Sequence, residues 1–135
     1  MSDGIANEKS DMTFMKGFIP GFALLVTVAG TAAQLTSGPE LEMSTDTMAI
    51  IRWTTTNPGG TDLHYGIVHY GTDATNLTQV ARSPNRRNPS HADMIFRVRI
   101  DRLNSHTTYY YTVESTGASD ASDGVASPVG AFKTK

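Results

Sequence analysis

The sequence contains no cysteine among its 135 residues. This absence excludes a disulfide framework, a thiolate zinc site and a cysteine nucleophile. The sequence also lacks an excess of one charge, because 11 basic and 13 acidic residues leave a formal charge of −2. Domains that bind nucleic acid are usually strongly basic, so this balance argues against a nucleic-acid partner. The length suits one domain of about 100–200 residues, which can stabilise itself by burying apolar surface.

Long apolar runs are also scarce, and the one exception lies near the N-terminus. Phe18–Leu35 contains no charged residue, and its middle, Phe22–Val28, is almost wholly apolar. Lys16 precedes this run, and the small residues Thr31-Ala32-Ala33 follow its apolar centre. A basic end, a short apolar stretch and small residues are the three parts of a secretory signal. We therefore expect residues 1–33 to be a signal peptide cleaved after Ala33 or an apolar N-terminal anchor.

The same N-terminal region allows other interpretations. Met1–Met15 is acidic where a signal should be basic, and translation from Met12 or Met15 would remove this conflict. As an uncleaved membrane anchor the apolar run is short, and Pro20 weakens it as a helix. Met15-Lys16-Gly17-Phe18 resembles the junction before the apolar helix of type IV pilins, although Phe22 stands where that family has glutamate. A secreted protein, a membrane-tethered protein and a filament subunit therefore remain open.

The rest of the chain, residues 38–135, alternates apolar and polar residues in short segments separated by turns. Met94–Ile100 has the clearest alternation, and Asn57-Pro58-Gly59-Gly60 is a typical turn sequence. We expect seven strands and no helix longer than a turn, which predicts an all-β antiparallel sandwich. The expected strands are Glu40–Ser44, Thr47–Thr55, His64–Gly71, Leu77–Arg82, Met94–Ile100, Thr107–Ser115 and Pro128–Thr134. In the last strand, Val129, Ala131 and Phe132 are available to pack.

Two sets of residues carry a resemblance to known families. The motif Leu103-x-Ser105-x-Thr107-x-Tyr109-x-Tyr111-x-Val113 resembles the fibronectin type III corner, where a tyrosine hydrogen-bonds back across the loop. Five segments in order resemble the N-terminal fibronectin-type domain of purple acid phosphatases: Ile50–Gly60, His69–Thr72, Phe96–Ile100, Thr107–Tyr111 and Asp123–Val129. The resemblance implies an immunoglobulin-like, fibronectin type III sandwich over residues 38–135. We expect its core to contain Trp53, Tyr70, Phe96, Leu103, Tyr109 and Tyr111.

This resemblance also implies that the chain is not an enzyme. Purple acid phosphatases do their chemistry in a separate C-terminal metallophosphoesterase domain, with metal-binding motifs of the GD-x-G, GD-x-x-Y and GNHE kind. None of these motifs occurs in this sequence. We therefore expect no catalytic residue, no cofactor and no metal ligand.

The histidines and aspartates give no independent sign of a catalytic or metal site. His64 and His69 are five residues apart, so on one strand they point to opposite faces and cannot share a metal ion. We expect them, like His91 and His106, to be exposed strand and turn residues. The loop 120–123 lacks EF-hand spacing, so we expect a flexible turn rather than a calcium site. No Gly-x-Ser-x-Gly motif frames a serine nucleophile.

Arginines concentrate in one stretch, where six of the 11 basic residues fall between positions 82 and 102. Guanidinium groups suit bidentate contacts with an anionic polysaccharide, a phosphorylated surface or an acidic partner domain. An outward tyrosine could add a stacking surface for sugars. The alternative is a solvated sheet face balanced by neighbouring carboxylates. The predicted partner-binding patch consists of Arg86, Arg87, Arg97, Arg99 and Tyr110.

These observations together predict a non-catalytic, exported binding or adhesion module, secreted or at the cell surface, whose partner is a protein or a surface polysaccharide. One alternative is a subunit of an extracellular filament or surface assembly, a homo-oligomer that packs Phe18–Leu35 between protomers. Another is an accessory domain of a separately encoded metallophosphoesterase. We expect membrane contact only through Phe18–Leu35, and only if this segment is not cleaved.

Overall fold

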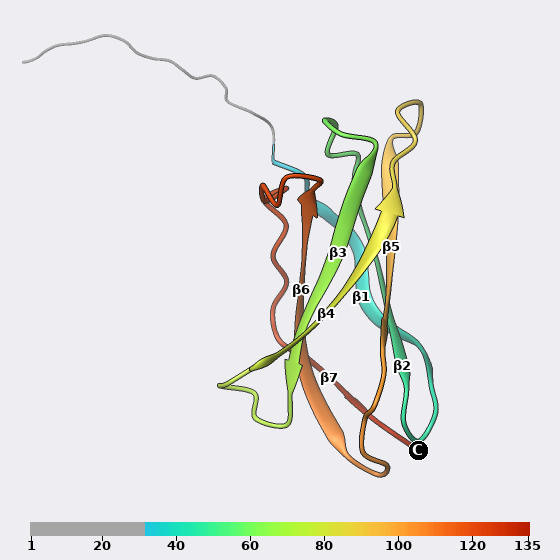
Figure 1. Cartoon of the computed structure of the whole chain (residues 1–135), viewed down its shortest axis with the longest axis vertical. Helices are drawn as coiled ribbons and strands as arrows, with labels where there is room; N and C mark the ends of the chain where they lie inside the picture. The colour runs from blue at the N-terminus through green and yellow to red at the C-terminus, as the bar shows by residue number, and fades with distance from the viewer. Residues whose placement is uncertain (1–31) are drawn as a thin grey trace, which may run out of the picture. The chain divides into compact units, whose positions relative to one another are not determined.

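The computed structural model describes residues 32–135 and consists there of seven strands in two antiparallel sheets (Figure 1). One sheet has the order β1-β2-β5 and the other the order β4-β3-β6-β7. The predicted all-β sandwich is therefore confirmed. Within residues 32–135 there is no helix long and apolar enough to cross a membrane. The strands are β1 (Leu35–Ser44), β2 (Ala49–Thr56), β3 (Leu63–Gly71), β4 (Gln79–Arg86), β5 (Asp93–Ile100), β6 (Thr108–Gly117) and β7 (Gly130–Lys133).

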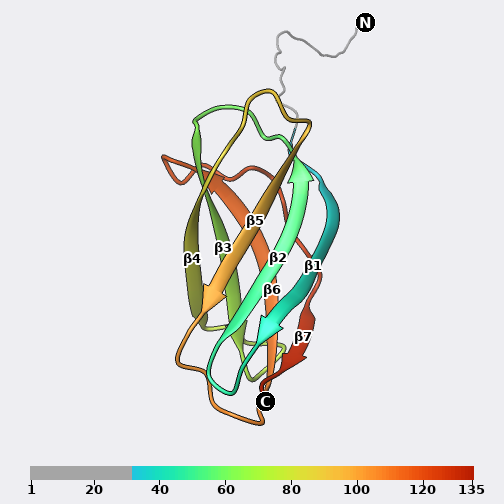
Figure 2. The same ribbon diagram turned by 90° about the vertical axis from the view of Figure 1, so that its right-hand side faces the viewer.

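The two sheets pack face to face (Figure 2). Along the central strands β2 and β5, one residue in two enters the core. Trp53 of β2 and Phe96 of β5 are directly opposite in the register, and their rings stack with centroids 5.4 Å apart. Gly66 of β3 faces this pair from the other sheet. A Cβ atom there would lie 3.0 Å from Val98 Cγ2 and 3.1 Å from Trp53 Cη2. The absence of a side chain at Gly66 thus allows the two sheets to close over the indole ring.

A second aromatic group fills the other half of the core. Tyr109 of β6 stacks on Phe132 of β7, with centroids 5.7 Å apart, and Tyr70 of β3 meets Tyr109 edge to face. Gly130 makes room for Tyr111, because a Cβ atom on Gly130 would lie 2.9 Å from the ring. The six residues expected in the core are all buried: Trp53, Tyr70, Phe96, Leu103, Tyr109 and Tyr111.

Most strand ends lie within one or two residues of the sequence-based expectation, and the largest differences are at β1 and β4. β1 begins at Leu35 rather than near Glu40, and β4 spans Gln79–Arg86 rather than Leu77–Arg82. β4 is an edge strand with mostly polar residues, so its pairing with β3, not its own pattern, sets its ends.

The last strand also differs from the expectation. β7 is short because it pairs only with the first four residues of β6. The expectation that Val129 and Ala131 pack was wrong: Val129 is 50% exposed and Ala131 is exposed, whereas Phe132 is buried.

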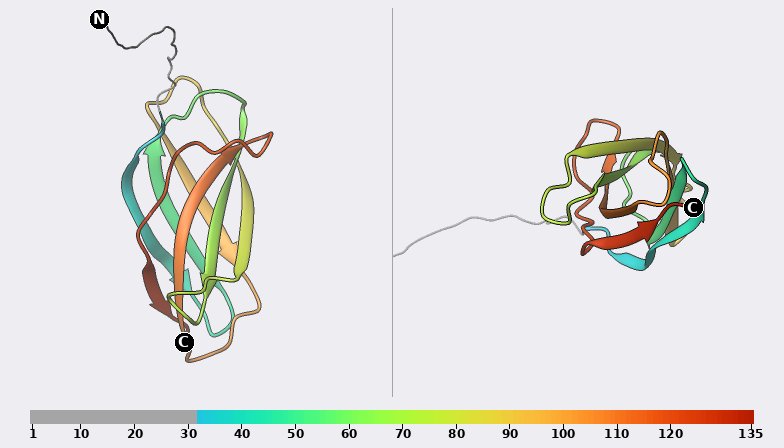
Figure 3. Two further views of the ribbon diagram at one scale, coloured as in Figure 1. Left: turned by 90° about the vertical axis from the view of Figure 1, so that its left-hand side faces the viewer. Right: turned by 90° about the horizontal axis from the view of Figure 1, so that it is seen from below.

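The sandwich has two poles with different loops. The loop pole carries the β2–β3 loop (57–62), the β4–β5 loop (87–92) and the start of the β6–β7 segment (118–129). The corner pole carries the β5–β6 loop (101–107), the β1–β2 and β3–β4 turns and the C-terminal residue Lys135. Figure 3 shows the β6–β7 segment descending from the loop pole toward β7.

The chain enters the described part at the loop pole. Ala33 is 5% exposed, and its N–H donates to the Asp123 carbonyl at 2.9 Å. The predicted signal or anchor (residues 1–33) and the pilin-like junction lie outside the described residues, apart from Ala32 and Ala33.

Candidate functional site at the loop pole

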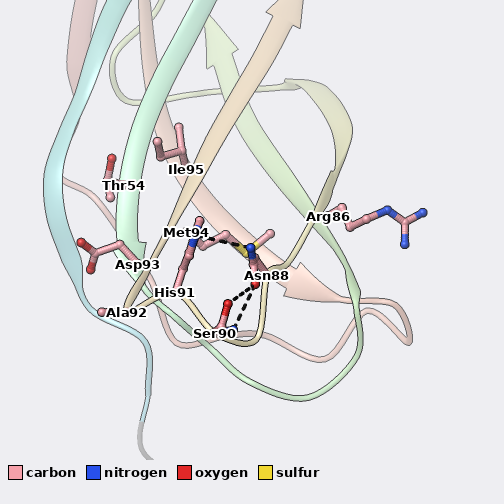
Figure 4. A pocket seen from close by; sticks show the side chains of 9 residues that line it. All are labelled: Thr54, Arg86, Asn88, Ser90, His91, Ala92, Asp93, Met94 and Ile95. Carbon is pink, nitrogen blue, oxygen red and sulfur yellow. Dashed lines mark hydrogen bonds between the residues drawn. The ribbon is translucent and has the colours of Figure 1, made fainter.

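A hollow of about 670 Å³ opens at the loop pole, between the β4–β5 loop and the outer face of β5 (Figure 4). Its lining combines polar side chains with apolar ones, among which Ile95 is 45% exposed. The Arg86 side chain points away from the other lining side chains (Figure 4). The polar lining residues are Thr54, Asn88, Ser90, His91 and Asp93. Hydrogen-bonding groups next to an apolar wall are typical of a binding site rather than a reaction centre.

The loop beneath this hollow is held by its neighbours. Asn57 Nδ2 donates to the carbonyl oxygens of Asn88 and His91, at 2.9 and 2.8 Å. Within the loop, Asn88 Oδ1 accepts from the Ser90 N–H at 3.0 Å and from its hydroxyl at 2.8 Å. Because these contacts fix the backbone before any partner arrives, little ordering entropy remains to be lost on binding.

Arg87 connects the β4–β5 loop to the β2–β3 loop. Its side chain is only 12% exposed. Its Nε donates to the Thr61 carbonyl at 3.0 Å and its Nη2 to the Gly60 carbonyl at 2.8 Å, and Asp62 lies 3.6 Å away. The guanidinium is thus occupied inside the protein. Arg87 holds two loops together and is not free for a partner.

A buried cluster around His64 joins the remaining segments of the loop pole. His64 Nδ1 lies 2.9 Å from Asp123 Oδ2, and His64 Nε2 lies 2.9 Å from the Gly59 carbonyl. Ser115 Oγ donates to the same carboxylate oxygen at 2.8 Å. The His64 side chain is 2% exposed and that of Asp123 9%. The expectation of an exposed His64 was therefore wrong, and Asp123 of the 120–123 turn is held by contacts with His64 and Ser115.

This cluster contains a serine, a histidine and an aspartate, but it is not arranged as a catalytic triad. In a triad the histidine accepts the serine proton, whereas here Ser115 donates to Asp123. Both His64 nitrogens already have partners, so neither is available as a base for Ser115. The cluster can therefore stabilise the pole but cannot activate a nucleophile.

His69 occupies the opposite face of β3, as its spacing from His64 predicted. Its Nε2 pairs with Glu114 Oε2 on the outer face of the sheet, where both side chains are 35% exposed. A smaller hollow of about 380 Å³ lies beside this pair, next to residues 122–127. Within residues 32–135, no group of three or more His, Cys, Asp and Glu side chains could hold a metal ion.

The predicted arginine and tyrosine patch does not form one surface. Arg97 and Arg99 lie on the outer face of β5, where they pair with Glu42 at 2.8 Å and Asp101 at 2.7 Å. Tyr110 lies on β6 in the other sheet. β5 and β6 have the same alternation of buried and outward residues but belong to different sheets. The sequence pattern therefore could not show that Arg97 and Tyr110 lie on different faces of the sandwich.

The two remaining residues of the patch lie at the loop pole. The Arg87 side chain is largely covered and is hydrogen-bonded to the β2–β3 loop. Arg86 is the last residue of β4, beyond the Arg82 end of the expected strand, and it is exposed at the hollow. Of the five residues, Arg86 alone combines exposure with a place at this site.

The corner pole is closed by uncharged groups. The Asn104 N–H donates to Tyr109 Oη at 2.8 Å, which is the contact that the fibronectin-type motif predicted. The Thr107 N–H donates to Thr134 Oγ1 at 2.9 Å. Burial raises the pKa of Tyr70, and the neighbouring Tyr109 adds to the rise. Burial is also the main cause that raises the pKa of Tyr111, followed by the charge of Glu40.

An exposed turn at the same pole holds another perturbed group. Hydrogen bonds from the backbone and hydroxyl of Thr75 lower the pKa of Asp73.

Comparison with known proteins gives one family and a set of similar folds. No curated protein matches the chain. Solved structures of the sensor domain of the anti-sigma factor RsgI4 from Pseudobacteroides cellulosolvens are similar. Its long form is 21% identical, covering 76% of this chain and 86% of that one, with a TM-score of 0.48. Its short form is 23% identical, covering 80% and 97%, with a TM-score of 0.47.

The family comparison covers most of the chain. The family model described as Purple acid Phosphatase, N-terminal domain, matches residues 37–134. The match contains no catalytic domain, in agreement with the absence of the metal-binding motifs from the sequence. The chain therefore belongs to the family of purple acid phosphatase N-terminal domains.

Proposed function

We propose that this chain is a non-catalytic, exported β-sandwich module that binds a protein or a surface polysaccharide through its loop pole. The observation that carries this proposal is the open hollow of about 670 Å³ standing on loops that are already fixed by internal polar contacts. Immunoglobulin-like sandwiches commonly bind through the loops gathered at one end. Membership of an N-terminal, non-catalytic domain family supports a binding role over a chemical one.

The lining of the hollow supports a polar partner. Asp93 and Arg86 are exposed, and neither forms an ion pair with another of residues 32–135. Asp93 offers acceptors to hydroxyl or amide groups, and Arg86 offers a bidentate donor to an anionic group. Ile95 offers an apolar contact beside them. The hollow does not include the other residues of the predicted patch. Partner contacts at Arg97, Arg99 and Tyr110 remain a prediction for the outer faces of β5 and β6.

Export is proposed from the apolar N-terminal run. The order of Lys16, the apolar residues 22–29 and Thr31-Ala32-Ala33 matches a secretory signal. N-terminal sequencing of the protein recovered from the outside of its native cells tests this step. A mature protein beginning at or near Gln34 supports export, and a cytosolic protein that retains Met1 contradicts it.

Binding is tested by passing envelope proteins and surface polysaccharides of the native organism over the immobilised chain. A double variant, Asp93→Ala with Ile95→Ala, changes the hollow without touching the core. Asp46→Ala with Val80→Ala is a matched control, because it removes one exposed carboxylate and one exposed apolar side chain away from the loop pole. We expect the first variant to weaken the captured interaction at least about tenfold, as a small cluster of contacts commonly does.

Three results would contradict this proposal. If no partner is captured, the binding role is wrong. If the control weakens binding as much as the hollow variant does, the site lies elsewhere. If phosphate release occurs with the pure chain and stops with a chelator, the non-catalytic role is wrong.

A second candidate is an accessory domain of a separately encoded metallophosphoesterase. Family membership favours it, because the matched domain is the N-terminal one of a phosphatase. Co-purification of a metal-dependent phosphatase with the tagged chain would select this function. The same purification measures the size of the protein, and a polymer that retains Phe18 would instead indicate the filament subunit.

A further inference from the structure

The hollow at the loop pole lies along an unpaired edge of the sheet β1-β2-β5. β5 is the last strand of this sheet, and β4, the strand beside the hollow, belongs to the other sheet. Asp93 and Ile95 point to the outer face of β5 and Met94 points to the core, yet all three line the hollow. Because neighbouring residues of a strand point to opposite faces, a hollow lined by all three runs along the edge of the strand.

The register of β5 determines which of its backbone groups face this edge. The Asn57 N–H donates to the Ala92 carbonyl at 2.9 Å, on the side where β5 pairs with β2. In an antiparallel pair, every second residue bonds to the neighbouring strand, and the residues between turn their N–H and C=O groups away from it. Continued from Ala92, this alternation turns the backbone groups of Asp93 and Ile95 toward the free edge. The hollow therefore contains backbone donors and acceptors that β2 does not use.

The other edge strands carry features that hinder pairing with a further strand, and β5 does not. β1 contains Pro39 and three shifts of register against β2. β4 contains Pro84, which has no N–H to donate, and β7 has only 4 residues. β5 has 8 residues in one uninterrupted register with β2, without proline or glycine. A regular edge of this kind is a template for another strand.

We propose that the partner of the hollow is an extended polypeptide segment that adds to the free edge of β5 as an antiparallel strand. This inference rests on the proposed function, and it selects a protein over a polysaccharide. Only a polypeptide has the regular succession of N–H and C=O groups that matches the free groups of Asp93 and Ile95. Addition of a strand to an exposed sheet edge is a general mode of peptide recognition.

The walls of the hollow favour a single strand over the sheet edge of a second copy of this chain. Arg86, the last residue of β4, and Thr54 of β2 lie on opposite sides of the start of β5 (Figure 4). The loop 87–92 connects β4 to β5. The space beside β5 is thus bounded by β4 and by this loop. A second copy would bring its own β2 toward the position that β4 holds, whereas a lone segment would not.

The outer face of β5 determines the side chains that this segment needs. Asp93 is exposed and forms no ion pair with any other residue that the structure describes, and Ile95 is 45% exposed. Side chains directly opposite each other on paired strands are in contact, and opposite charges there attract. The segment therefore has a basic residue opposite Asp93 and an apolar residue opposite Ile95. Because the pairing is antiparallel, the apolar residue comes two positions before the basic one.

The free edge is tested first on the full chain alone, by amide hydrogen exchange followed by NMR. We expect the amide protons of Asp93 and Ile95 to exchange about tenfold faster than that of Met94, which faces β2, the factor that one hydrogen bond gives. This measurement requires no variant and no partner. Equal exchange at the three positions would mean that the edge is not free and would overturn the inference.

The occupant is tested with the synthetic peptide Thr-Thr-Ile-Thr-Lys-Thr-Thr, blocked at both ends and titrated into the full chain. We expect the peptide to slow amide exchange at Asp93 and Ile95 and to leave residues 101–107, at the corner pole, unchanged. A peptide with N-methylated isoleucine keeps the side chain but lacks the N–H that faces Ile95, so it should bind about tenfold more weakly. If the N-methylated peptide binds as well as the first, strand addition is wrong.

A change of charge tests the register of the added strand. A second peptide has glutamate in place of lysine, and the wild-type chain should bind it about fivefold more weakly, the range of one cross-strand charge pair. Asp93→Lys should reverse this preference. Asp46→Lys is the matched control, because it changes an exposed carboxylate in the β1–β2 turn, and it should keep the preference of the wild type. A preference that Asp93→Lys leaves unchanged, or that Asp46→Lys also reverses, would contradict the inference.

The partner captured from the native organism separates this inference from the proposed function. A captured protein that slows exchange at Asp93 and Ile95 supports both. A captured polysaccharide, or a dimer of the chain that protects these amides without any peptide, contradicts the inference but leaves a binding role at the hollow. If the peptides bind as expected and no native partner is captured, the proposed function is wrong and the strand-accepting edge of β5 is supported.

Discussion

The two poles of the sandwich are both closed by buried polar contacts, but the contacts differ in charge. The loop pole depends on the His64–Asp123 pair and on the Arg87 guanidinium. The corner pole depends on the Tyr109 hydroxyl and on Thr134 Oγ1. Charged partners that are buried together lose their hydration, so the removal of one, which leaves the other unpaired, is strongly destabilising. A hydrogen bond between neutral partners contributes less to the free energy of unfolding, and its removal destabilises the fold less.

The poles also differ in the distance along the chain that their contacts close. At the corner pole, Asn104 and Tyr109 are five residues apart, so the contact forms wherever this loop forms. At the loop pole, His64 and Asp123 are 59 residues apart. The corner contact is therefore a local feature of the fold. The His64–Asp123 contact at the loop pole forms only when β3 and the β6–β7 segment have come together. Four measurements test this contrast.

The largest expected effect comes from Asp123→Ala. It leaves the buried His64 ring and the Ser115 hydroxyl without their shared acceptor. Breaking a buried pair in this way costs about 3–5 kcal/mol of unfolding free energy. Urea denaturation measures the loss. Asp120→Ala is the control, since its side chain is 76% exposed and its ion pair with Arg82 is worth less than about 1 kcal/mol. Equal losses in the two variants would show that the buried contacts of Asp123 contribute no more than one exposed ion pair.

Arg87→Ala should have the second largest effect. It removes donors from the Gly60 and Thr61 carbonyls, and hydrogen bonds from charged groups contribute about 1.5–3 kcal/mol. Arg87→Lys should recover only part of the loss, because an ammonium cannot reproduce the planar fork. Denaturation gives the free energies, and amide exchange should show the change confined to residues 57–62 and 87–92. A full recovery by lysine would mean that charge alone matters here.

Tyr109→Phe should have a smaller effect at the corner pole. It removes the acceptor of the Asn104 N–H, at a cost of about 1 kcal/mol. The cost stays low because Asn104 is exposed and its N–H can bond to water. The loss should be the same in acid and neutral solution, because the contact joins a phenol hydroxyl and a backbone N–H. Denaturation curves at several pH values test this, and a loss that varies over this range would show that the Asn104–Tyr109 contact is coupled to a charged group.

The smallest effect concerns strongly alkaline solution. The pKa values of Tyr70 and Tyr111 are raised above 10.0 in the fold, mainly by burial. The fold thus favours the protonated phenols, so their stabilisation is complete below pH 10.0 and is lost as the pH rises further. The unfolding temperature should fall in that range. Tyr111→Phe should flatten the fall, whereas Tyr110→Phe, on the outer face, should leave it unchanged.

Much of the fold could be predicted from the sequence because the relevant signals are local. Alternation placed Met94, Phe96, Val98 and Ile100 on one face of a strand, and all four are buried. Alternation also predicts that His64 points inward, because it is an even number of residues from the buried Val68 and Tyr70 on the same strand. Histidine is polar, however, and for that reason the His64 side chain was expected to be exposed. A polar residue in an inward position requires buried partners, and those partners lie elsewhere in the chain.

The candidate site could be predicted only in part. The concentration of arginines drew attention to residues 82–102, and Arg86 does lie at the hollow. The hollow itself depends on Asn57, which fixes the backbone at Asn88 and His91 from another loop. Contacts of this kind leave no periodic signal, because each joins residues whose spacing in sequence is arbitrary.

The sequence by itself determined the strands, the inward faces of β2 and β5, the tyrosine corner and the family. These features depend on neighbouring residues, whose preferences act before the chain is compact. The tertiary structure alone decided which sheet each strand joined, and therefore that Tyr110 and Arg97 lie on opposite faces of the sandwich. It also decided that His64 and Asp123 meet. Alternation shows which side of a strand is buried, but the pairing of strands requires contacts between distant segments, and these form only when the two sheets pack.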